Sequence, residues 1–143
     1  MSEPKIAAEV AAAEYARMVE ALDGNDGDAV REAMVGAIMA GRLSLDGEAL
    51  VYTLARPVEH ETGGGSTDRV TLPEPNNEDL EYVNRGMKVQ TSKGGEDVYV
   101  DMGDLYVKAR RMITRVGKLP LGIVQRIKRR DMAVLGEICN FFG

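Results

Sequence analysis

The sequence predicts an α+β fold that is mostly helical, with short helices packed around one two-stranded antiparallel β-hairpin. Apolar residues recur at spacings of three and four through most of the 143-residue chain, which is typical of amphipathic helices. Alternation of apolar and polar residues is limited to two short stretches that flank a glycine-rich loop. The chain has two Phe, five Tyr and no Trp, so aliphatic side chains must form the core, which suits helices better than a β-sandwich.

Two helices are expected at the start of the chain, over residues 2–24 and 26–47. In the first, alanine dominates and apolar residues recur along one side until Gly24 ends the helix. In the second, Asp28 is expected to be the N-cap, because a short acidic side chain accepts hydrogen bonds from the free N–H groups of a first turn. Gly41 stands where that helix is expected to stop.

Two strands are expected next, over residues 47–58 and 68–75. Leu50, Tyr52 and Leu54 share one side of the first strand, and Val70 and Leu72 share one side of the second. The polar loop between them contains three glycines at 63–65, so the pair is expected to form a β-hairpin with a long tip. Pro57 and Pro73 are expected to end the pairing, since proline has no N–H to donate to a strand ladder.

The third and fourth helices are expected to follow the hairpin. One covers residues 76–87 and is capped by Asn76 or Asn77, with acidic residues behind the cap that complement the positive end of the helix. The other begins near Asp101 and continues to Gly117, with apolar residues along one side. The apolar sides of these two helices are expected to contribute to the core.

The last 25 residues predict two further helices that are both basic and strongly apolar. Pro120 begins the first, which is short, and Asp131 is expected to cap the second. Their apolar positions lie at helical spacing: Ile123, Val124, Ile127, Met132, Leu135, Cys139 and Phe142. This stripe serves either the core or a contact with another polypeptide.

Charge is distributed unevenly along the chain. The net charge is −5, but residues 1–107 carry 9 basic and 21 acidic residues, whereas residues 108–143 carry 9 basic and 2 acidic residues. A basic end of this kind can bind anions. It is equally typical of helices whose solvated sides are basic, and the acidity of the whole chain weakens attraction to nucleic acid.

Patterns for catalysis or metal binding are incomplete. Residues 23–34 resemble a calcium loop, but Met34 stands where an EF-hand requires glutamate. The glycine-rich loop lacks the lysine of a Walker motif, and His60 beside it is expected to be exposed. Cys139 is expected to be a buried structural thiol. We therefore expect no enzyme activity, no cofactor and no metal.

The chain is expected to be cytoplasmic. One cysteine permits no internal disulfide, which fits a reducing compartment. The N-terminal segment has no basic start, and glutamates interrupt its alanine run, so it does not resemble a secretory signal. No apolar stretch reaches the roughly 18 residues that a membrane-spanning helix needs.

Two blocks of the chain carry a family resemblance. The first is "YTLARPV", a loop and "DRVTLPEPNNEDLEYVNR", where the matching residues are Leu72, Pro75, Asp79 and Leu80. The second is "KLPLGIVQRIKRRDMAVLGEICNFF", where the matching residues are Leu119, Pro120, Val124, Ile127, Asp131, Leu135, Ile138 and Phe142. Over residues 48–142 the sequence resembles the phage tail assembly chaperone family, small proteins that attend the tape-measure protein of long-tailed phages.

The resemblance implies a non-enzymatic protein that binds the tape-measure protein during tail morphogenesis in the bacterial cytoplasm. Such a protein is absent from the mature virion, and the tail-tube protein is a further candidate partner. Residues 46–143 would form the chaperone-like unit, and residues 1–45 a helical pair added as an extension. Self-association is left open. The expected partner-binding side chains lie on the last two helices: Ile123, Ile127, Leu135, Ile138, Phe141 and Phe142.

Two other functions stay open at this point. One is a small nucleic-acid-binding phage regulator that uses the basic C-terminal helices, through Arg110, Arg111, Arg115, Arg126, Arg129 and Arg130. The other is a head–tail adaptor or tail-completion protein of the virion. Neither requires a membrane or a cofactor.

Overall fold

The computed structural model describes residues 5–60, 63–86, 89–91, 98–100 and 102–143. Within these residues the fold mixes helix and sheet, in the order α1 (Ala8–Leu22), α2 (Asp28–Met39), β1 (Leu43–Asp46), β2 (Ala49–Glu59), β3 (Ser66–Pro73), α3 (Asn77–Asn84), β4 (Val89–Thr91), β5 (Val98–Val100), α4 (Met102–Arg115), α5 (Leu121–Val124) and α6 (Arg129–Phe142). The helical character expected from the sequence is confirmed, although the expected start of α4 at Asp101 lies outside the described residues.

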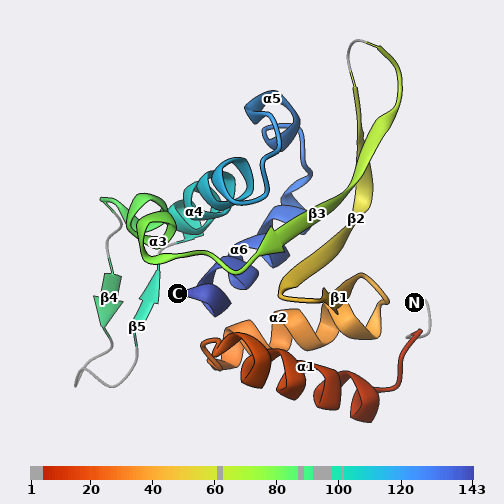
Figure 1. Ribbon diagram of the computed structural model, residues 1–143, viewed down its shortest axis with the longest axis vertical. Coiled ribbons are helices and arrows are strands. Elements are labelled where there is room, and N and C mark those ends of the chain that lie inside the picture. Colours follow the sequence, from red (N-terminus) through yellow and green to blue (C-terminus); the bar gives the residue numbers. More distant parts are fainter. Residues whose placement is uncertain (1–4, 61–62, 87–88, 92–97, 101) are drawn as a thin grey trace.

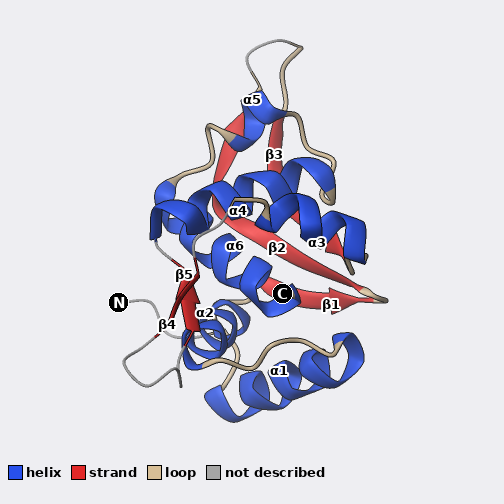
Figure 2. Ribbon diagram, turned by 90° about the vertical axis from the view of Figure 1, so that its left-hand side faces the viewer, coloured by secondary structure: helices blue, strands red, loops and turns tan. Residues whose placement is uncertain are grey.

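Helix α6 occupies the centre of the molecule and packs against α4, α2 and β2. Figure 1 shows α4, α3 and α5 on one side of α6, and the antiparallel pair α1 and α2 on its other side. The β2–β3 hairpin runs past α6 and projects beyond the helices at its tip, which is clear in both Figure 1 and Figure 2. The C-terminal helix is therefore enclosed by elements from both halves of the chain.

The main sheet has three antiparallel strands in the order β1-β2-β3, so the expectation of a two-stranded hairpin was wrong. The missed strand, β1, follows α2 directly and pairs with the first half of β2, from Leu43 opposite Tyr52 to Asp46 opposite Ala49. Gly47 joins them with φ of +64°, the positive value that two-residue hairpin turns favour. A separate sheet pairs β4 with β5.

Strand β2 continues through Pro57, which was expected to end it. The register with β3 shifts between Thr53 and Val58, so Pro57 lies in an irregular stretch where the missing N–H breaks no ladder bond. Pairing then resumes and lengthens the hairpin towards its tip. At the other end, Pro73 is the last residue of β3, opposite Ala49, as expected.

Two helix caps show where local sequence decided the structure and where it did not. Asn76 caps α3 and forms a reciprocal capping box with Asp79, which confirms one of the two expected caps. Asp28 does not cap α2, because the N-cap is Gly27 and Asp28 is the first helical residue. Gly41 has φ of +74° just after α2, which confirms the expected stop.

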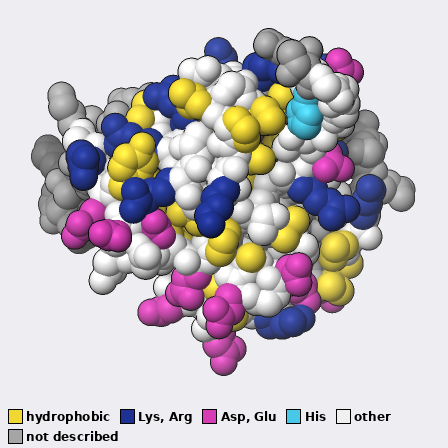
Figure 3. Space-filling view, turned by 45° about the horizontal axis from the view of Figure 1, so that its top comes forward, with side chains coloured by type: hydrophobic (Ala, Val, Ile, Leu, Met, Phe, Trp, Pro, Cys, Tyr) yellow, Lys and Arg dark blue, Asp and Glu magenta, His cyan; other side chains and the backbone are white. Residues whose placement is uncertain are grey.

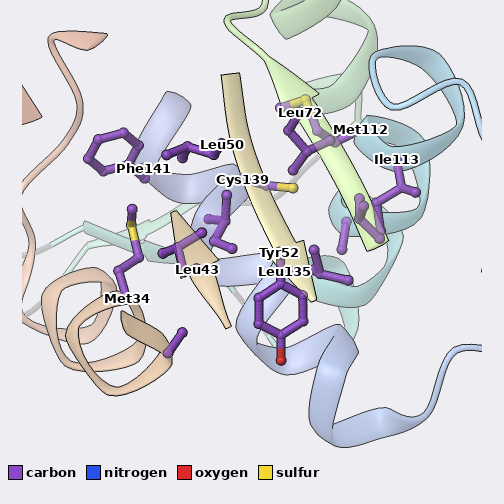
Figure 4. Packing of buried hydrophobic residues seen from close by; sticks show 14 of the residues in the cluster. Met34, Leu43, Leu50, Tyr52, Leu72, Met112, Ile113, Leu135, Cys139 and Phe141 are labelled. Atoms are coloured by element: carbon purple, nitrogen blue, oxygen red, sulfur yellow. The ribbon is translucent and has the colours of Figure 1, made fainter. Parts of the chain in front are cut away.

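One hydrophobic core joins the N-terminal helices to the rest of the chain. Side chains from α2, β2, α4 and α6 meet in it, among them Met34, Leu50, Met112 and Leu135 (Figure 4). Cys139 lies within the same cluster and is fully buried, as expected for a structural thiol. The fold therefore buries one shared core and not two separate ones.

The expected division of the chain between residues 45 and 46 falls inside β1. The helical pair is also fastened to the C-terminal end of α6. The N–H of Asn25 donates to the carbonyl of Phe141 at 2.8 Å, and a Cβ added to Gly24 would come within 2.2 Å of the Phe141 ring. Residues 1–45 are thus an integral part of this fold as far as they are described.

Candidate functional site

A groove with a volume of about 760 Å³ separates α2 from α6. We call it the α2–α6 groove. Its α2 wall consists of small side chains and one acid, Ala29, Glu32, Ala33, Gly36, Ala37 and Ala40, and its α6 wall of Arg130, Ala133, Val134 and Glu137. Arg42, Tyr52, Ala55 and Leu105 complete the lining. Such a lining is mainly apolar and nearly free of bulky groups on the α2 side.

The sequence of α2 produces two distinct faces. Val30, Met34 and Ile38 recur every four residues and are buried in the core. The small residues recur at the same helical spacing on the other side, so the backbone of α2 is accessible from the groove. Another polypeptide can approach this wall more closely than a wall of leucines.

A chain of polar side chains runs from the interior to the α6 wall. Lys108, which is 3% exposed, donates from Nζ to Oδ1 of Asn140 at 3.0 Å. Asn140 donates in turn from Nδ2 to Oε1 of Glu137 at 3.3 Å. The second carboxylate oxygen of Glu137, Oε2, is buried and has no hydrogen-bond partner. This oxygen is enclosed by the protein, so Glu137 carries an unsatisfied internal acceptor behind the surface of the groove.

Burial dominates the electrostatics of this polar chain. It raises the pKa of Glu137, although Asn140 and the charge of Lys108 act in the opposite direction. It also lowers the pKa of Lys108, which the neighbouring acidic groups partly offset. The charged forms of both Glu137 and Lys108 are therefore disfavoured at this position.

A second acid, Asp131, anchors the start of α6 to β2. It is fully buried and accepts hydrogen bonds from the Tyr52 hydroxyl at 2.8 Å, the Ala55 N–H at 2.9 Å and the Arg56 N–H at 3.1 Å. Those N–H groups belong to the irregular stretch of β2, where Asp131 replaces a strand partner. Burial, with the bond to Asp131, raises the pKa of Tyr52. The anchor holds Tyr52 and Ala55 at the end of the groove.

The expected role of Asp131 as an N-cap was wrong. The N-cap of α6 is Lys128, which makes no side-chain cap bond, and Asp131 is the third residue of the helix. Its carboxylate is directed at β2 because that strand offers three donors. The position of this acid near a predicted helix start correctly indicated a structural role. The groups that it binds, however, belong to β2, which lies far away in the sequence.

Most of the side chains expected to bind a partner are used by the core. Leu135, Ile138 and Phe141 have no exposed surface, because α2 and α4 pack against α6 and the Phe141 ring lies against Gly24 and Tyr15. Ile127, which precedes α6, is 7% exposed. Ile123 and Phe142 are partly buried against the same core. In this fold the predicted contact surface is therefore reduced to the exposed parts of these two residues.

Arg111 and Arg115, which were predicted to contact nucleic acid, are held by internal bonds. Arg111 donates from Nη1 to the carbonyl oxygens of Val83 and Arg85, at 3.3 and 2.7 Å. Arg115 donates from Nε to Asp79 at 2.7 Å and lies 5.0 Å from the ring centre of Tyr82. These contacts hold α3 against α4, and Arg115 keeps the pKa of Asp79 low.

The remaining candidates for chemistry have structural partners. His60 is half-buried, and its Nε2 lies 2.8 Å from the hydroxyl of Thr67 across the hairpin. Burial raises the pKa of the Cys139 thiol to about 12. Among the described residues, no three His, Cys, Asp or Glu side chains gather as a metal site would require. Nor does that part of the chain contain a helix with the length and apolarity needed to cross a membrane.

Comparison with known proteins provides no relative. No protein-family model matches the chain. No curated protein and no solved structure matches it. Function must therefore be inferred from the α2–α6 groove and from the surface chemistry around it. The groove escaped prediction because its two walls lie about a hundred residues apart, although the alanine spacing in α2 is visible in the sequence.

Proposed function

We propose that this chain is a non-catalytic binding protein that holds a helix of a partner polypeptide in the α2–α6 groove. The observation that supports this most is the combination of a small-residue wall with an unpartnered buried acceptor, Oε2 of Glu137. Helix-in-groove recognition uses an apolar groove and a few placed polar groups. No arrangement of nucleophile, base and oxyanion donors accompanies the groove in the described residues, so binding alone is proposed.

The dimensions of the groove suit about three turns of helix. The α2 wall extends from Ala29 to Ala40, which is roughly 17 Å at 1.5 Å per residue. A partner helix that lies along it would place side chains at i, i+3, i+4 and i+7 against the alanines. Small and medium apolar residues fit best, because the wall offers little depth.

Charge selects the polar side chain of the partner. Glu32 and Glu137 are the acids of the groove, and Arg42 and Arg130 are its bases. Oε2 of Glu137 is enclosed and lacks a donor, so a lysine, arginine or amide N–H on the partner helix would satisfy it once the Glu137 side chain turned towards the groove. The occupant is therefore an amphipathic helix with one donor among apolar residues.

We identify this occupant with the tape-measure protein of a long-tailed phage, as the resemblance to the tail assembly chaperones suggests. A long helical protein with apolar stripes would aggregate unless the stripes were covered until the tail tube forms around it. A chaperone of this kind acts in the host cytoplasm and is absent from the finished particle. The tail-tube protein stays a second candidate partner.

Filling the groove tests the proposal. Gly36 lines the groove and has no neighbouring atom within 4 Å of an added Cβ, so Gly36→Leu adds a bulky side chain where its first atom has room, and it improves helix propensity by about 0.8 kcal/mol. The matched control is Ala13→Leu on the exposed side of α1. Each variant is co-expressed with the tape-measure protein encoded in the same genome, and the soluble fraction of that protein is measured.

We expect the wild-type protein and Ala13→Leu to keep the tape-measure protein soluble and Gly36→Leu to fail while it remains folded. Equal activity of the two variants would contradict binding in the groove. The absence of a tape-measure gene from the genome, or the presence of this chain in purified virions, would contradict the chaperone and favour an adaptor or tail-completion protein. Tight, salt-sensitive binding in a gel-shift titration would favour the nucleic-acid regulator.

A further inference from the structure

A second hollowed surface lies across α3, α4 and α5. One hollow, of about 380 Å³, is lined by Tyr82, Arg110, Arg111, Thr114 and Leu121. A second, of about 330 Å³, is lined by Tyr106, Arg110, Val124, Gln125, Ile127, Arg129 and Met132. Arg110 belongs to both, so it stands between two neighbouring hollows. We call this surface the Arg110 cleft. It shares no lining residue with the α2–α6 groove.

Large apolar side chains are unusually exposed in this cleft. Leu121 is 50% exposed and Tyr82 is 36% exposed, and Val10 on α1 is the other large exposed hydrophobic among the described residues. In the second hollow, Val124 and Met132 provide apolar walls. Clustering of such side chains in a basic cleft is a mark of a contact surface.

The cleft is positively charged, and its arginines differ in whether the protein itself provides them with a bonding partner. The guanidinium of Arg111 is bonded to carbonyl oxygens of α3, so it contributes charge from a fixed position. Arg110 and Arg129 are exposed, and neither forms an ion pair with an acid of the described residues. Figure 3 shows Lys and Arg side chains among hydrophobic ones at the end of the molecule that carries α5, with acidic side chains mainly along the left and lower margins.

We propose that the Arg110 cleft docks an acidic amphipathic segment of a partner polypeptide. A carboxylate of that segment pairs with the guanidinium of Arg110, and apolar side chains on either side of it enter the two hollows. The order apolar, acidic, apolar follows from the position of Arg110 between the hollows. This surface is independent of the α2–α6 groove and provides the protein with a second partner site, which is basic.

A polypeptide fits the cleft better than a nucleic acid does. The acids of α3 that precede Tyr82, Glu78 and Glu81, are exposed and would repel a phosphate backbone that continued past the cleft. Arg111 and Arg115 are held by internal contacts, which removes two of the cations that a longer phosphate track would need. Discrete apolar hollows on either side of Arg110 suit a side-chain carboxylate between two apolar residues.

The test uses short fluorescent helical peptides in which one Glu stands between two Leu at i−4 and i+3. A matched peptide carries Lys in place of that Glu, and a single-stranded oligonucleotide provides the nucleic-acid comparison. Binding to the full chain is measured by anisotropy at low salt, and ¹⁵N amide shifts locate the site. The variants are Arg110→Glu and Leu121→Ser, with Arg69→Glu on exposed β3 as the control of equal charge change.

We expect the Glu peptide to bind, with amide shifts concentrated on α3, α4 and α5. Arg110→Glu should weaken it at least about tenfold, as the loss of a charge-assisted pair predicts. Leu121→Ser should weaken it less, and Arg69→Glu should leave it unchanged. Equal binding of the Lys peptide, no binding of either peptide, shifts elsewhere, or tighter binding of the oligonucleotide would each overturn the proposal. None of these results depends on whether the α2–α6 groove binds a helix.

Discussion

The two acids of α6 provide the most informative comparison in the molecule. Asp131, near the start of the helix, is fully buried and accepts three hydrogen bonds from β2. Glu137, less than two turns later, has one weakly bonded oxygen and one buried oxygen without a partner. A buried acid with all its donors stabilises a fold, whereas a buried acid with an unpaired oxygen costs stability.

The largest effect is expected from removing the satisfied acid. Asp131→Ala leaves the Tyr52 hydroxyl and the N–H groups of Ala55 and Arg56 without an acceptor in a buried site. We expect a loss of about 3 kcal/mol in the free energy of unfolding. Urea denaturation followed by circular dichroism measures it. A loss below about 1 kcal/mol would show that the anchor is not structural.

A smaller effect is expected from removing one of its donors. Tyr52→Phe deletes the hydroxyl but leaves both backbone N–H groups on Asp131, so we expect a loss of about 1 kcal/mol. In the Asp131→Ala background the same substitution should cost much less, since its partner is already absent. Additive losses in this double-mutant cycle would mean that the two side chains do not interact.

Glu137, the acid with the unpartnered oxygen, should affect how the free energy of unfolding changes with pH. It should have little effect on the magnitude of that free energy. Burial raises the pKa of Glu137, so the folded chain holds this proton more tightly than the unfolded chain. The associated stability is complete below the ordinary glutamate pKa of about 4.3 and is lost as the pH rises through the raised folded value. Glu137→Gln should flatten this decline in denaturation curves measured from pH 4 upwards. An unchanged slope would assign the decline to other groups.

The smallest effect is expected from the lysine at the other end of the polar chain. The positive charge of Lys108 lowers the pKa of Glu137, so Lys108→Met should raise that pKa further. The decline in stability should then move to higher pH in the same titration. An unchanged position of the decline would mean that the charge of Lys108 does not act on Glu137.

The sequence predicted those parts of the fold that depend on neighbours in the chain. The capping box of Asn76 and the positive-φ stop at Gly41 follow from a few adjacent residues, and both are confirmed. The short strand β1 was missed because its four residues are too few to show a periodicity. Its strand conformation depends on its pairing with β2. Likewise, Pro57 can lie within β2 only because the register with β3 shifts there.

The candidate site was less predictable for the same reason. Phe141 and Leu135 have the apolar spacing of a contact stripe, but neighbouring helices cover them, which only tertiary packing reveals. Asp131 could be recognised as special, although its donors on β2 could not be known. The unsatisfied oxygen of Glu137 depends on the absence of a donor in three dimensions, and no sequence pattern encodes that.

Hydrogen exchange of the chain, alone and after addition of the proposed tape-measure partner, tests the central claim most directly. Amides of residues 29–40 and 130–137 form the walls of the α2–α6 groove, so occupation should slow their exchange through suppressed local opening. We predict new protection in both segments together, lost in Gly36→Leu. Protection that is absent from these segments, or confined to α3 and α5, would contradict helix binding in the groove.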